Sequence, residues 1–236
     1  MNLNYPGKEL DLFSNAVNWK SYFSSSLKKY IKGDILEVGA GIGSNTKFLI
    51  NKNVKSVTCL EPDIDLFKVL QQNDSQQNVL SKKLINGTIN DVNNTFDTII
   101  YIDVLEHIED SKKEITIIKK KLNKNGILII LVPAYNFLYS NFDKEIGHFR
   151  RYNKKLLRYE INNELIEKKI FYLDSLGFCA SLFNKLFLNK SIPTLSNINF
   201  WDKKLIPISK ITDKVLYFVF GKSLIGIYQK KYNESM

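Results

Sequence analysis

A short apolar run that ends in a glycine-rich loop constrains this chain more than any other feature. Residues 35–43 read ILEVGAGIG, with Glu37 two positions before the first of three glycines, Gly39, Gly41 and Gly43. Glycine-rich turns after a strand let the backbone approach a bound nucleotide. The dinucleotide-binding spacing, however, places its third glycine one residue later. A carboxylate beside the turn would also repel a pyrophosphate, whereas it suits a charged amino group.

Short β-rich runs alternate with helical segments over the first half of the chain. The expected strands are Ile35–Val38, Ser56–Leu60, Lys83–Asn86, Phe96–Ile102 and Gly126–Val132. Helices are expected near 44–51, 63–72 and 111–123, and then near 153–162, with two later strands near 165–173 and 223–230. This alternation predicts an α/β fold, in which a mostly parallel sheet has helices on both faces.

Three further segments accompany the expected sheet within a single domain of 236 residues. Residues 9–30 form an amphipathic segment, expected either to cover a ligand cleft or to pack as an ordinary core helix. Residues 133–152 are aromatic-rich and predict a long loop, which in a compact domain is usually functional. Residues 175–215 are rich in Phe and Leu. They predict an insertion that is a lid or acceptor pocket, or alternatively the hydrophobic interface of a homodimer.

The formal net charge of +10 raises the question of an anionic partner. The lysines are spread along the whole chain, which favours an ordinary solvated surface over a nucleic-acid-binding face and leaves peripheral contact with a membrane open. No apolar run reaches the ~20 residues of a transmembrane segment, and residues 1–11 lack a signal-peptide pattern. The two cysteines give no disulfide framework. We therefore expect a cytoplasmic protein.

Several positions that follow the expected strands, taken together with the glycine-rich loop, resemble the class I S-adenosylmethionine (SAM) methyltransferases. Glu61-Pro62 closes the second expected strand, Gly87-Thr88 follows the third, and the run DVLEH at 103–107 follows the fourth. These positions cover residues 35–133, the expected SAM-binding core. The resemblance implies a Rossmann-like fold with a seven-stranded, mostly parallel sheet.

The resemblance also implies SAM as the cofactor and gives its contacts. The loop that begins at Glu37 would hold the methionine part, with the carboxylate at the amino group. Glu61, followed by Pro62, would accept hydrogen bonds from the ribose hydroxyls. Gly87 and Thr88 would lie against the adenine, although many members of the family have Asp at the second of these positions. Asp103, at the end of the fourth strand, completes the expected cofactor set.

Both histidines of the chain and two of its three arginines follow the fourth and fifth expected strands. Ligands of this kind of fold bind where parallel strands end. Histidine can accept the proton of a hydroxyl group, so His148 is the expected base, with His107 as second choice or as a packing residue. Arg150 and Arg151 would hold a phosphate or carboxylate on the acceptor, or pair with acids of their own loop.

A divalent metal is a second use for the same residues. Asp103, Glu106 and His107 are spaced i, i+3, i+4, so that a helix would place them on one face. With His148 they would form a carboxylate and imidazole set suited to Mg²⁺, Mn²⁺ or Zn²⁺. This set is similar to that of metal-assisted methyltransferases that act on catechols or RNA ends. The same run also occurs in metal-free relatives, so the metal is the weaker hypothesis.

These patterns together predict a SAM-dependent methyltransferase. The sulfonium of SAM is already reactive, so the protein must align a nucleophile, exclude water and remove a proton. The expected reaction is O-methylation of a small or lipid- or glycan-linked acceptor that carries a phosphate or carboxylate. The alternatives are an RNA methyltransferase, which the positive charge favours, and a non-catalytic SAM-binding scaffold subunit.

Overall fold

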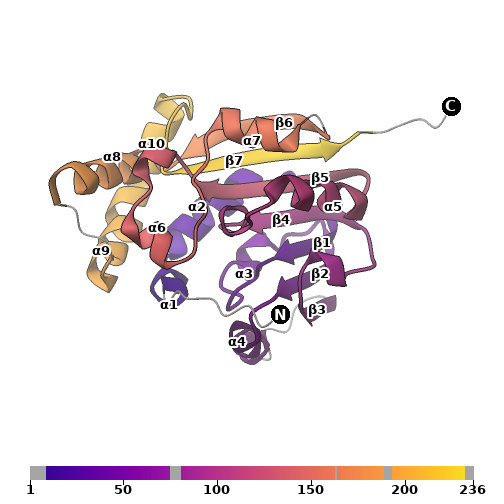
Figure 1. Cartoon of the computed structure of the whole chain (residues 1–236). Coiled ribbons are helices and arrows are strands. Elements are labelled where there is room, and N and C mark those ends of the chain that lie inside the picture. Colours follow the sequence, from indigo (N-terminus) through magenta and orange to yellow (C-terminus); the bar gives the residue numbers. More distant parts are fainter. Residues whose placement is uncertain (1–8, 75–80, 163, 189–192, 232–236) are drawn as a thin grey trace.

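Seven strands pair into one sheet in the order β3-β2-β1-β4-β5-β7-β6 (Figure 1). The computed structural model describes residues 9–74, 81–162, 164–188 and 193–231. Strands β1 to β5 run parallel, and β7 lies antiparallel between β5 and β6. The strands are β1 (Gly33–Val38), β2 (Val54–Glu61), β3 (Ser81–Asn86), β4 (Phe96–Ile102), β5 (Leu122–Pro133), β6 (Leu165–Leu173) and β7 (Ser223–Lys230). The predicted seven-stranded Rossmann-like fold is confirmed.

Helices cover both faces of this sheet, and two apolar cores lie between the layers. Strands β4 and β5 are apolar on both sides, as parallel strands between two helical layers must be. One core contains Phe23 of α2 and Leu70 of α4, and the other contains Ile115 of α5 and Leu157 of α7. The covering helices are α2 (Val17–Leu27), α3 (Thr46–Leu49), α4 (Ile64–Asp74), α5 (Ser111–Lys121) and α7 (Lys154–Ile161).

The expected helices differ from the structure in two places. The amphipathic segment 9–30 is not one helix but two, α1 (Glu9–Ser14) and α2. The segment 133–152 is not a plain loop, because it contains the short helices η3 (Asn136–Leu138) and α6 (Asn141–Glu145). Ser140 and Asp143 form a capping box that begins α6, a local signal for a helix start.

The parallel arrangement brings distant segments to one edge of the sheet. Strands β1 to β5 end at the left of Figure 1, where α1 and α6 also lie. Because β7 runs in the opposite direction, it begins at this same edge. The loops after β1, β2, β4 and β5 and the residue before β7 therefore meet here. Ligands of doubly wound α/β folds bind at this edge.

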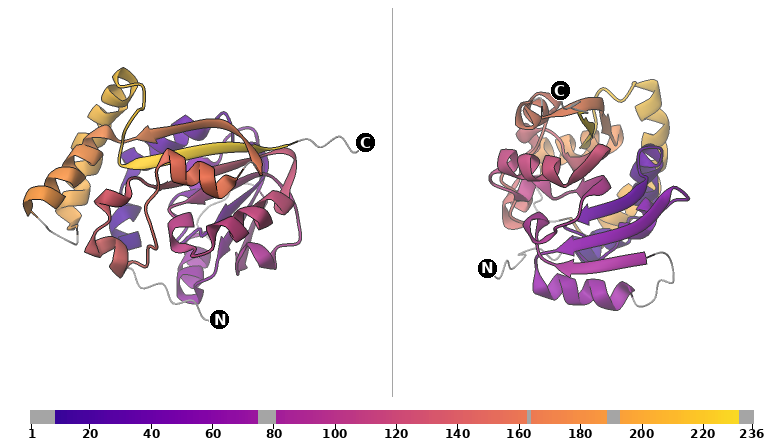
Figure 2. Two further views of the ribbon diagram at one scale, coloured as in Figure 1. Left: turned by 45° about the horizontal axis from the view of Figure 1, so that its top comes forward. Right: turned by 90° about the vertical axis from the view of Figure 1, so that its right-hand side faces the viewer.

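The segment between β6 and β7 is mostly helical in its described part. It contains α8 (Ser175–Phe183), the π-helical turns η4 (Asn184–Leu188) and η5 (Trp201–Leu205), α9 (Leu195–Phe200) and α10 (Ile206–Val215). Figure 2 shows these helices standing out from the end of the sheet. Among the described residues, no helix is long and apolar enough to cross a membrane.

Three buried aspartates attach this insertion to the rest of the fold. Asp174 has a left-handed backbone with φ of 68°, and its carboxylate accepts hydrogen bonds from the Trp201 indole at 2.7 Å and the Ser209 hydroxyl at 2.8 Å. Asp213 accepts from the Tyr22 hydroxyl of α2 at 2.8 Å. Because each carboxylate is buried, its hydrogen bonds fix the insertion against the strand end and α2.

The third aspartate, Asp202, completes the first turn of α2 from the far side of the sequence. Helix α2 begins after Ala16, which provides no side-chain cap. Asp202 accepts hydrogen bonds from the backbone amides of Trp19 at 2.8 Å and Asn18 at 3.2 Å. A carboxylate at a helix N-terminus pairs with free amides and with the positive end of the helix dipole.

Replacing Asp202 with alanine should therefore lower the free energy of unfolding by roughly 3 kcal/mol, because buried amide donors of α2 lose their acceptor. Urea denaturation followed by circular dichroism measures this change. Asp65→Ala, at a carboxylate on α4 whose side chain is 75% exposed, is the matched control and should change stability by less than about 0.5 kcal/mol. Equal stability of the two variants would contradict the anchoring role of Asp202.

Candidate active site

The glycine-rich loop turns sharply after β1. Gly39, Gly41 and Gly43 all have positive φ, at 65°, 56° and 79°. A Cβ atom at Gly39 would lie 2.6 Å from Val104, and one at Gly43 would lie 2.7 Å from Leu70. Both the backbone conformation and the space therefore require glycine here. The result is a tight main-chain turn at the edge where β1 ends.

Glu61 holds this loop against the end of β2. Its two carboxylate oxygens accept hydrogen bonds from the backbone amides of Gly41 at 2.7 Å and Asp63 at 2.9 Å. Burial raises the pKa of Glu61, although these two amides oppose the shift. These two bonds fix the orientation of the carboxylate. Each oxygen keeps a second lone pair, which could accept a further hydrogen bond from a ligand. Pro62 follows within this turn, and its carbonyl accepts a hydrogen bond from the side-chain amide of Asn86 at 3.2 Å.

Glu37 lies beneath the loop, at the end of β1. Its carboxylate accepts a hydrogen bond from the Thr46 hydroxyl at 2.6 Å, and the side chain is almost completely buried. Burial raises the pKa of Glu37 to about 7. At neutral pH the group is therefore poised between its charged and uncharged forms, and a nearby cation would favour the charged form.

The turn after β3 lies beside this loop. The Gly87 amide donates to the Glu61 carbonyl at 3.1 Å, which ties the end of β3 to the end of β2. Thr88 caps the short helix η1 (Ile89–Asp91) through reciprocal bonds with Asp91. The two residues expected at the adenine thus lie next to the residue expected at the ribose.

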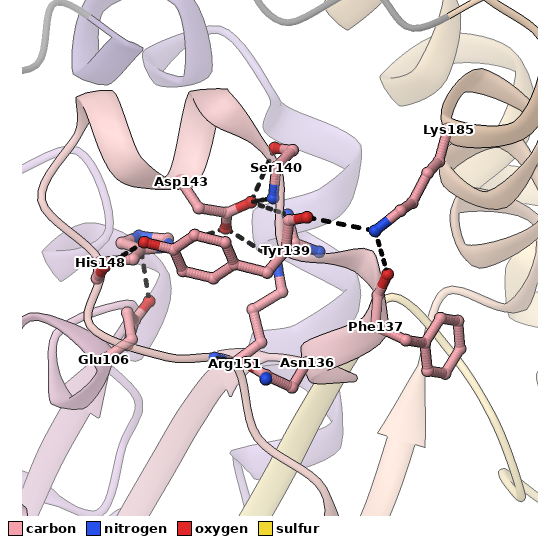
Figure 3. A network of polar contacts seen from close by, with 9 residues as sticks. All are labelled: Glu106, Asn136, Phe137, Tyr139, Ser140, Asp143, His148, Arg151 and Lys185. Atoms are coloured by element: carbon pink, nitrogen blue, oxygen red, sulfur yellow. Dashed lines mark hydrogen bonds and ion pairs between the residues drawn. The ribbon is translucent and has the colours of Figure 1, made fainter.

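Asp143 organises the polar residues after β5 (Figure 3). Its fully buried carboxylate bonds to the His148 Nδ1 atom at 2.9 Å and accepts from Arg151 through Nε at 2.7 Å and Nη2 at 2.9 Å. The Ser140 amide and hydroxyl also donate to it, each at 2.8 Å. Burial alone would raise the pKa of Asp143, but the bonds from His148 and Arg151 lower it well below its usual range.

This buried anion determines which nitrogen of His148 is free. Because Asp143 is an acceptor, Nδ1 carries the proton in the neutral ring, and Nε2 keeps its lone pair. The Nε2 atom lies 3.8 Å from Glu106 Oε1, which is too far for a hydrogen bond. The Tyr139 hydroxyl fixes the same segment by donating to the His148 carbonyl at 2.6 Å.

Glu106 and His107 approach His148 from the short helix η2 (Leu105–His107) after β4. The two imidazole rings meet edge to face, with centroids 4.5 Å apart. Burial and the neighbouring His148 lower the pKa of His107 to about 4, so it is neutral at pH 7. Burial raises the pKa of Glu106 well above its usual range, and neither carboxyl oxygen has a hydrogen-bond partner.

These three residues are also close enough to share a metal ion. One ligand atom from each of Glu106, His107 and His148 lies within 4.8 Å of the others. Asp103, expected as a further ligand on the same helical face, does not join this group. It has φ of 52° and lies before η2 begins, so the helix that would align it with Glu106 does not extend back to it.

Asp103 instead lies in the turn at the end of β4. Its backbone amide donates to the Leu131 carbonyl of β5 at 2.8 Å, which fixes the turn. Displacement of water by the surrounding residues raises the pKa of its carboxyl group to about 6, and the nearby His148, Lys222 and Arg151 oppose this shift. Asp103 thus lies between the glycine-rich loop and the residues that follow β5.

The structure separates the two arginines that the sequence pairs. The Arg150 guanidinium donates to the carbonyls of Ile108 at 3.1 Å and Glu109 at 2.7 Å and to the Ser111 hydroxyl at 3.0 Å. It also lies 3.5 Å from the Glu160 carboxylate. These contacts fasten the loop to the start of α5 and leave Arg151 as the arginine beside His148.

Lys222 is a residue of this edge that the sequence reasoning missed. It precedes β7, and its ammonium lies over the ring of Trp201 at 4.5 Å and that of Phe13 at 6.0 Å. Burial lowers its pKa, while the nearby carboxylates Asp174 and Asp103 oppose the shift. The signal that would have found it is topological, because an antiparallel strand begins where its parallel neighbours end.

Comparison with known proteins identifies the family. A family model described as a methyltransferase domain matches residues 19–180, which is more than half of the chain. The chain therefore belongs to this family and is a class I SAM-dependent methyltransferase. No curated protein sequence matches it.

Solved structures share the fold at low sequence identity. The N-methyltransferase NodS from Bradyrhizobium japonicum, in complex with S-adenosyl-L-homocysteine, has a TM-score of 0.60 at 14% identity, covering 97% of this chain and 94% of that one. The protein bound to the Trm112 methyltransferase activator of Haloferax volcanii has 0.64 at 13%, covering 97% and 98%. An S-adenosylmethionine-dependent methyltransferase from Clostridium acetobutylicum has 0.57 at 13%, covering 98% and 94%.

The buried Glu37 predicts a pH dependence of cofactor binding. S-adenosylhomocysteine carries the amino group that Glu37 is expected to contact, and below pH 7 that contact requires the carboxyl to release a proton. Its affinity, measured by calorimetry, should therefore rise with pH up to about 7 and then level off, with a slope approaching about tenfold per pH unit on the acid side. Glu37→Gln should remove this slope, and an unchanged profile would contradict the contact.

Proposed function

We propose that this methyltransferase transfers the methyl group of SAM to a hydroxyl oxygen of a small or lipid-linked acceptor that carries a phosphate or carboxylate. The observation that carries the proposal is the pairing of an oriented imidazole, His148, with cationic side chains at the edge of the sheet where ligands of such folds bind. Glu37, Gly39, Gly41 and Gly43 would hold the methionine part of the cofactor. Glu61, Pro62, Gly87 and Thr88 would hold its nucleoside, and Asp103 would complete the cofactor set.

His148 would serve as the general base. Its Nδ1 atom is engaged by the ionised Asp143 at 2.9 Å, which leaves Nε2 as the proton acceptor. A carboxylate in this position also stabilises the imidazolium that forms when the proton arrives. The acceptor hydroxyl would reach Nε2 directly or through one water molecule. His107, neutral at pH 7 and packed against the same ring, would hold the imidazole in place.

Lys222 and Arg151 would bind the anionic group of the acceptor. The Lys222 ammonium has aromatic faces on one side, and its pKa is lowered by burial, so an anion beside it would recover part of the lost charge stabilisation. Arg151 has one buried nitrogen, Nη1, without a hydrogen-bond partner. Arg150 would act indirectly, by holding the loop through its bonds to Ile108 and Glu109.

A divalent cation fits Glu106, His107 and His148 as a second use of the same group. Glu106 is buried with both oxygens unpaired, and the Nδ1 bond of His148 to Asp143 is the outer contact that metal-binding histidines usually make. A cation held there would lower the pKa of an acceptor hydroxyl. It would also occupy His148 Nε2, so the base and the metal are mutually exclusive roles for that atom.

The acceptor class can be tested with matched compounds. We expect the purified chain to form S-adenosylhomocysteine with hydroxylated carboxylates or phosphates and not with their uncharged amides or esters. Lys222→Gln should raise KM for the anionic acceptor on the order of tenfold with little change in kcat, because one charge-assisted contact is lost. Lys113→Gln, at an exposed lysine on α5, is the control. Transfer restricted to amines or to uncharged acceptors would overturn the proposal.

The role of His148 can be separated from that of a metal. We expect methyl transfer to survive thorough chelation, because a neutral Glu106 needs no cation to remain buried. His148→Gln should lower kcat by about 10²–10⁴-fold, since the base is lost while the volume of the side chain is roughly kept. Initial rates with and without chelator measure both effects. Activity that chelation removes and Mg²⁺, Mn²⁺ or Zn²⁺ restores would assign His148 as a ligand instead.

A further inference from the structure

The inserted helices expose an unusual amount of apolar surface. Of the eighteen large hydrophobic side chains that are exposed in the described residues, eleven lie between residues 175 and 219. Soluble proteins rarely gather this many at one place, and such patches usually mark an interaction surface. Figures 1 and 2 show the inserted helices at one end of the molecule, beyond the edge of the sheet that carries the active site.

Helix α10 presents a regular apolar stripe to solvent. Ile208, Ile211 and Val215 follow the i, i+3, i+7 spacing of one helix face, and the last two are 66% and 69% exposed. The opposite face of α10 is the one that packs inward, where Ser209 and Asp213 are fully buried. On α10, polar side chains are therefore buried against the protein, while an apolar stripe faces solvent.

The end of α8 and the turn η4 carry the second exposed group. Phe183, Leu186 and Phe187 are 55%, 65% and 71% exposed, and the two phenyl rings lie 4.9 Å apart. Helices α8 and α10 pack against each other, so the stripe and this group belong to one helical unit. These six residues, of which three lie on α10, one on α8 and two on η4, are called the apolar face of the insertion below.

The charges around the apolar face have a single sign. Asp202 and Asp213 are the acidic residues of segment 175–219, and both are buried. The exposed charged side chains in the described part of this segment are all lysines: Lys185, Lys203, Lys204 and Lys214. Exposed aliphatic and aromatic side chains among lysines are the composition of helices that lie in the surface of an anionic membrane.

We propose that the apolar face of the insertion docks on an anionic lipid membrane. A second copy of the chain fits less well, because a two-fold contact would bring the same lysines together without any exposed acid to pair with them. Protein interfaces are moreover poor in lysine. A phosphate backbone would use the lysines but leave the apolar side chains in water. A lipid surface uses both.

The inserted helices contact residues 133–152, called the acceptor loop here, and this contact connects the docking to the candidate active site. Lys185 of η4 donates to the backbone carbonyls of Phe137 and Tyr139, and the Tyr139 hydroxyl donates to the carbonyl of His148 (Figure 3). A membrane-bound insertion would therefore hold the acceptor loop close to the lipid surface. The docking itself does not depend on the proposed reaction, since it needs neither SAM nor an acceptor.

The proposal is tested by co-sedimentation of the full chain with vesicles of phosphatidylcholine, alone or mixed with phosphatidylglycerol. We expect binding to the mixed vesicles that weakens as salt is added. Ile211→Ser combined with Val215→Ser should reduce the partition coefficient by more than about tenfold. Val69→Ser, at a partly exposed valine of α4, is the matched control and should leave binding unchanged.

Variants that remove lysines test the electrostatic part of vesicle binding in the same co-sedimentation assay. Lys203→Gln with Lys204→Gln should weaken binding by about fivefold for each lysine removed, whereas Lys112→Gln with Lys113→Gln on α5 should have little effect. Circular dichroism confirms that each variant is folded. Failure of the parent chain to bind the mixed vesicles would overturn the proposal. So would self-association, seen by analytical ultracentrifugation, that the Ile211 and Val215 substitutions abolish in a chain that does not bind vesicles.

Discussion

The direction of the strands is the constraint on which the rest of the structure depends. Five parallel strands must all end at one edge, and an antiparallel β7 must begin there. That geometry brings Glu37, Glu61, Asp103, His148 and Lys222 to one region, although they are spread over most of the chain. None of these side chains could meet through local structure alone. The strand order and direction of the sheet therefore determine where the site lies, and the loops supply its side chains.

Several ionisable side chains at this edge are buried, and the opposite charges nearby do not fully compensate the lost hydration. Burial displaces water from Glu106, His107 and Lys222 and favours the uncharged form of each group. It therefore raises the pKa of Glu106 and lowers the pKa values of His107 and Lys222. Asp143 is the exception, since bonds from His148 and Arg151 keep it ionised. One fixed anion among groups that resist charge is sufficient to set the tautomer of His148. It also leaves the site short of negative charge, which an anionic acceptor would supply.

Local sequence patterns predicted most of the sheet and the turn of the glycine-rich loop. The last strand was expected near 223–230 and is Ser223–Lys230, and the three glycines of the first loop all have positive φ. Periodicity and steric requirements of this kind are local, so they can be read from the sequence. The splitting of segment 9–30 into two helices was not foreseen, because Asp202 completes the start of α2 from the opposite end of the chain.

The residues after β5 show where sequence reasoning stops. Arg150 and Arg151 are adjacent and chemically identical, yet one contacts the carbonyls before α5 and the other contacts Asp143. Which arginine faces the site depends on the path of the loop, and that path is set by the capping box of α6 and by the partners of each guanidinium. Asp103 was placed on a helical face that its positive φ excludes. Spacing predicts a shared face only while the backbone remains helical.

The exposed apolar surface of the insertion bears on the kind of acceptor that the site would use. A small soluble acceptor would need no apolar surface on the protein, and leaving so many hydrophobic side chains in water promotes aggregation. A lipid-linked acceptor changes this balance, since the same surface then places the chain where its substrate is concentrated. Lys185 connects the two regions through the carbonyls of Phe137 and Tyr139. Docking through the apolar face and an anionic, lipid-linked acceptor are therefore separate proposals that would support each other.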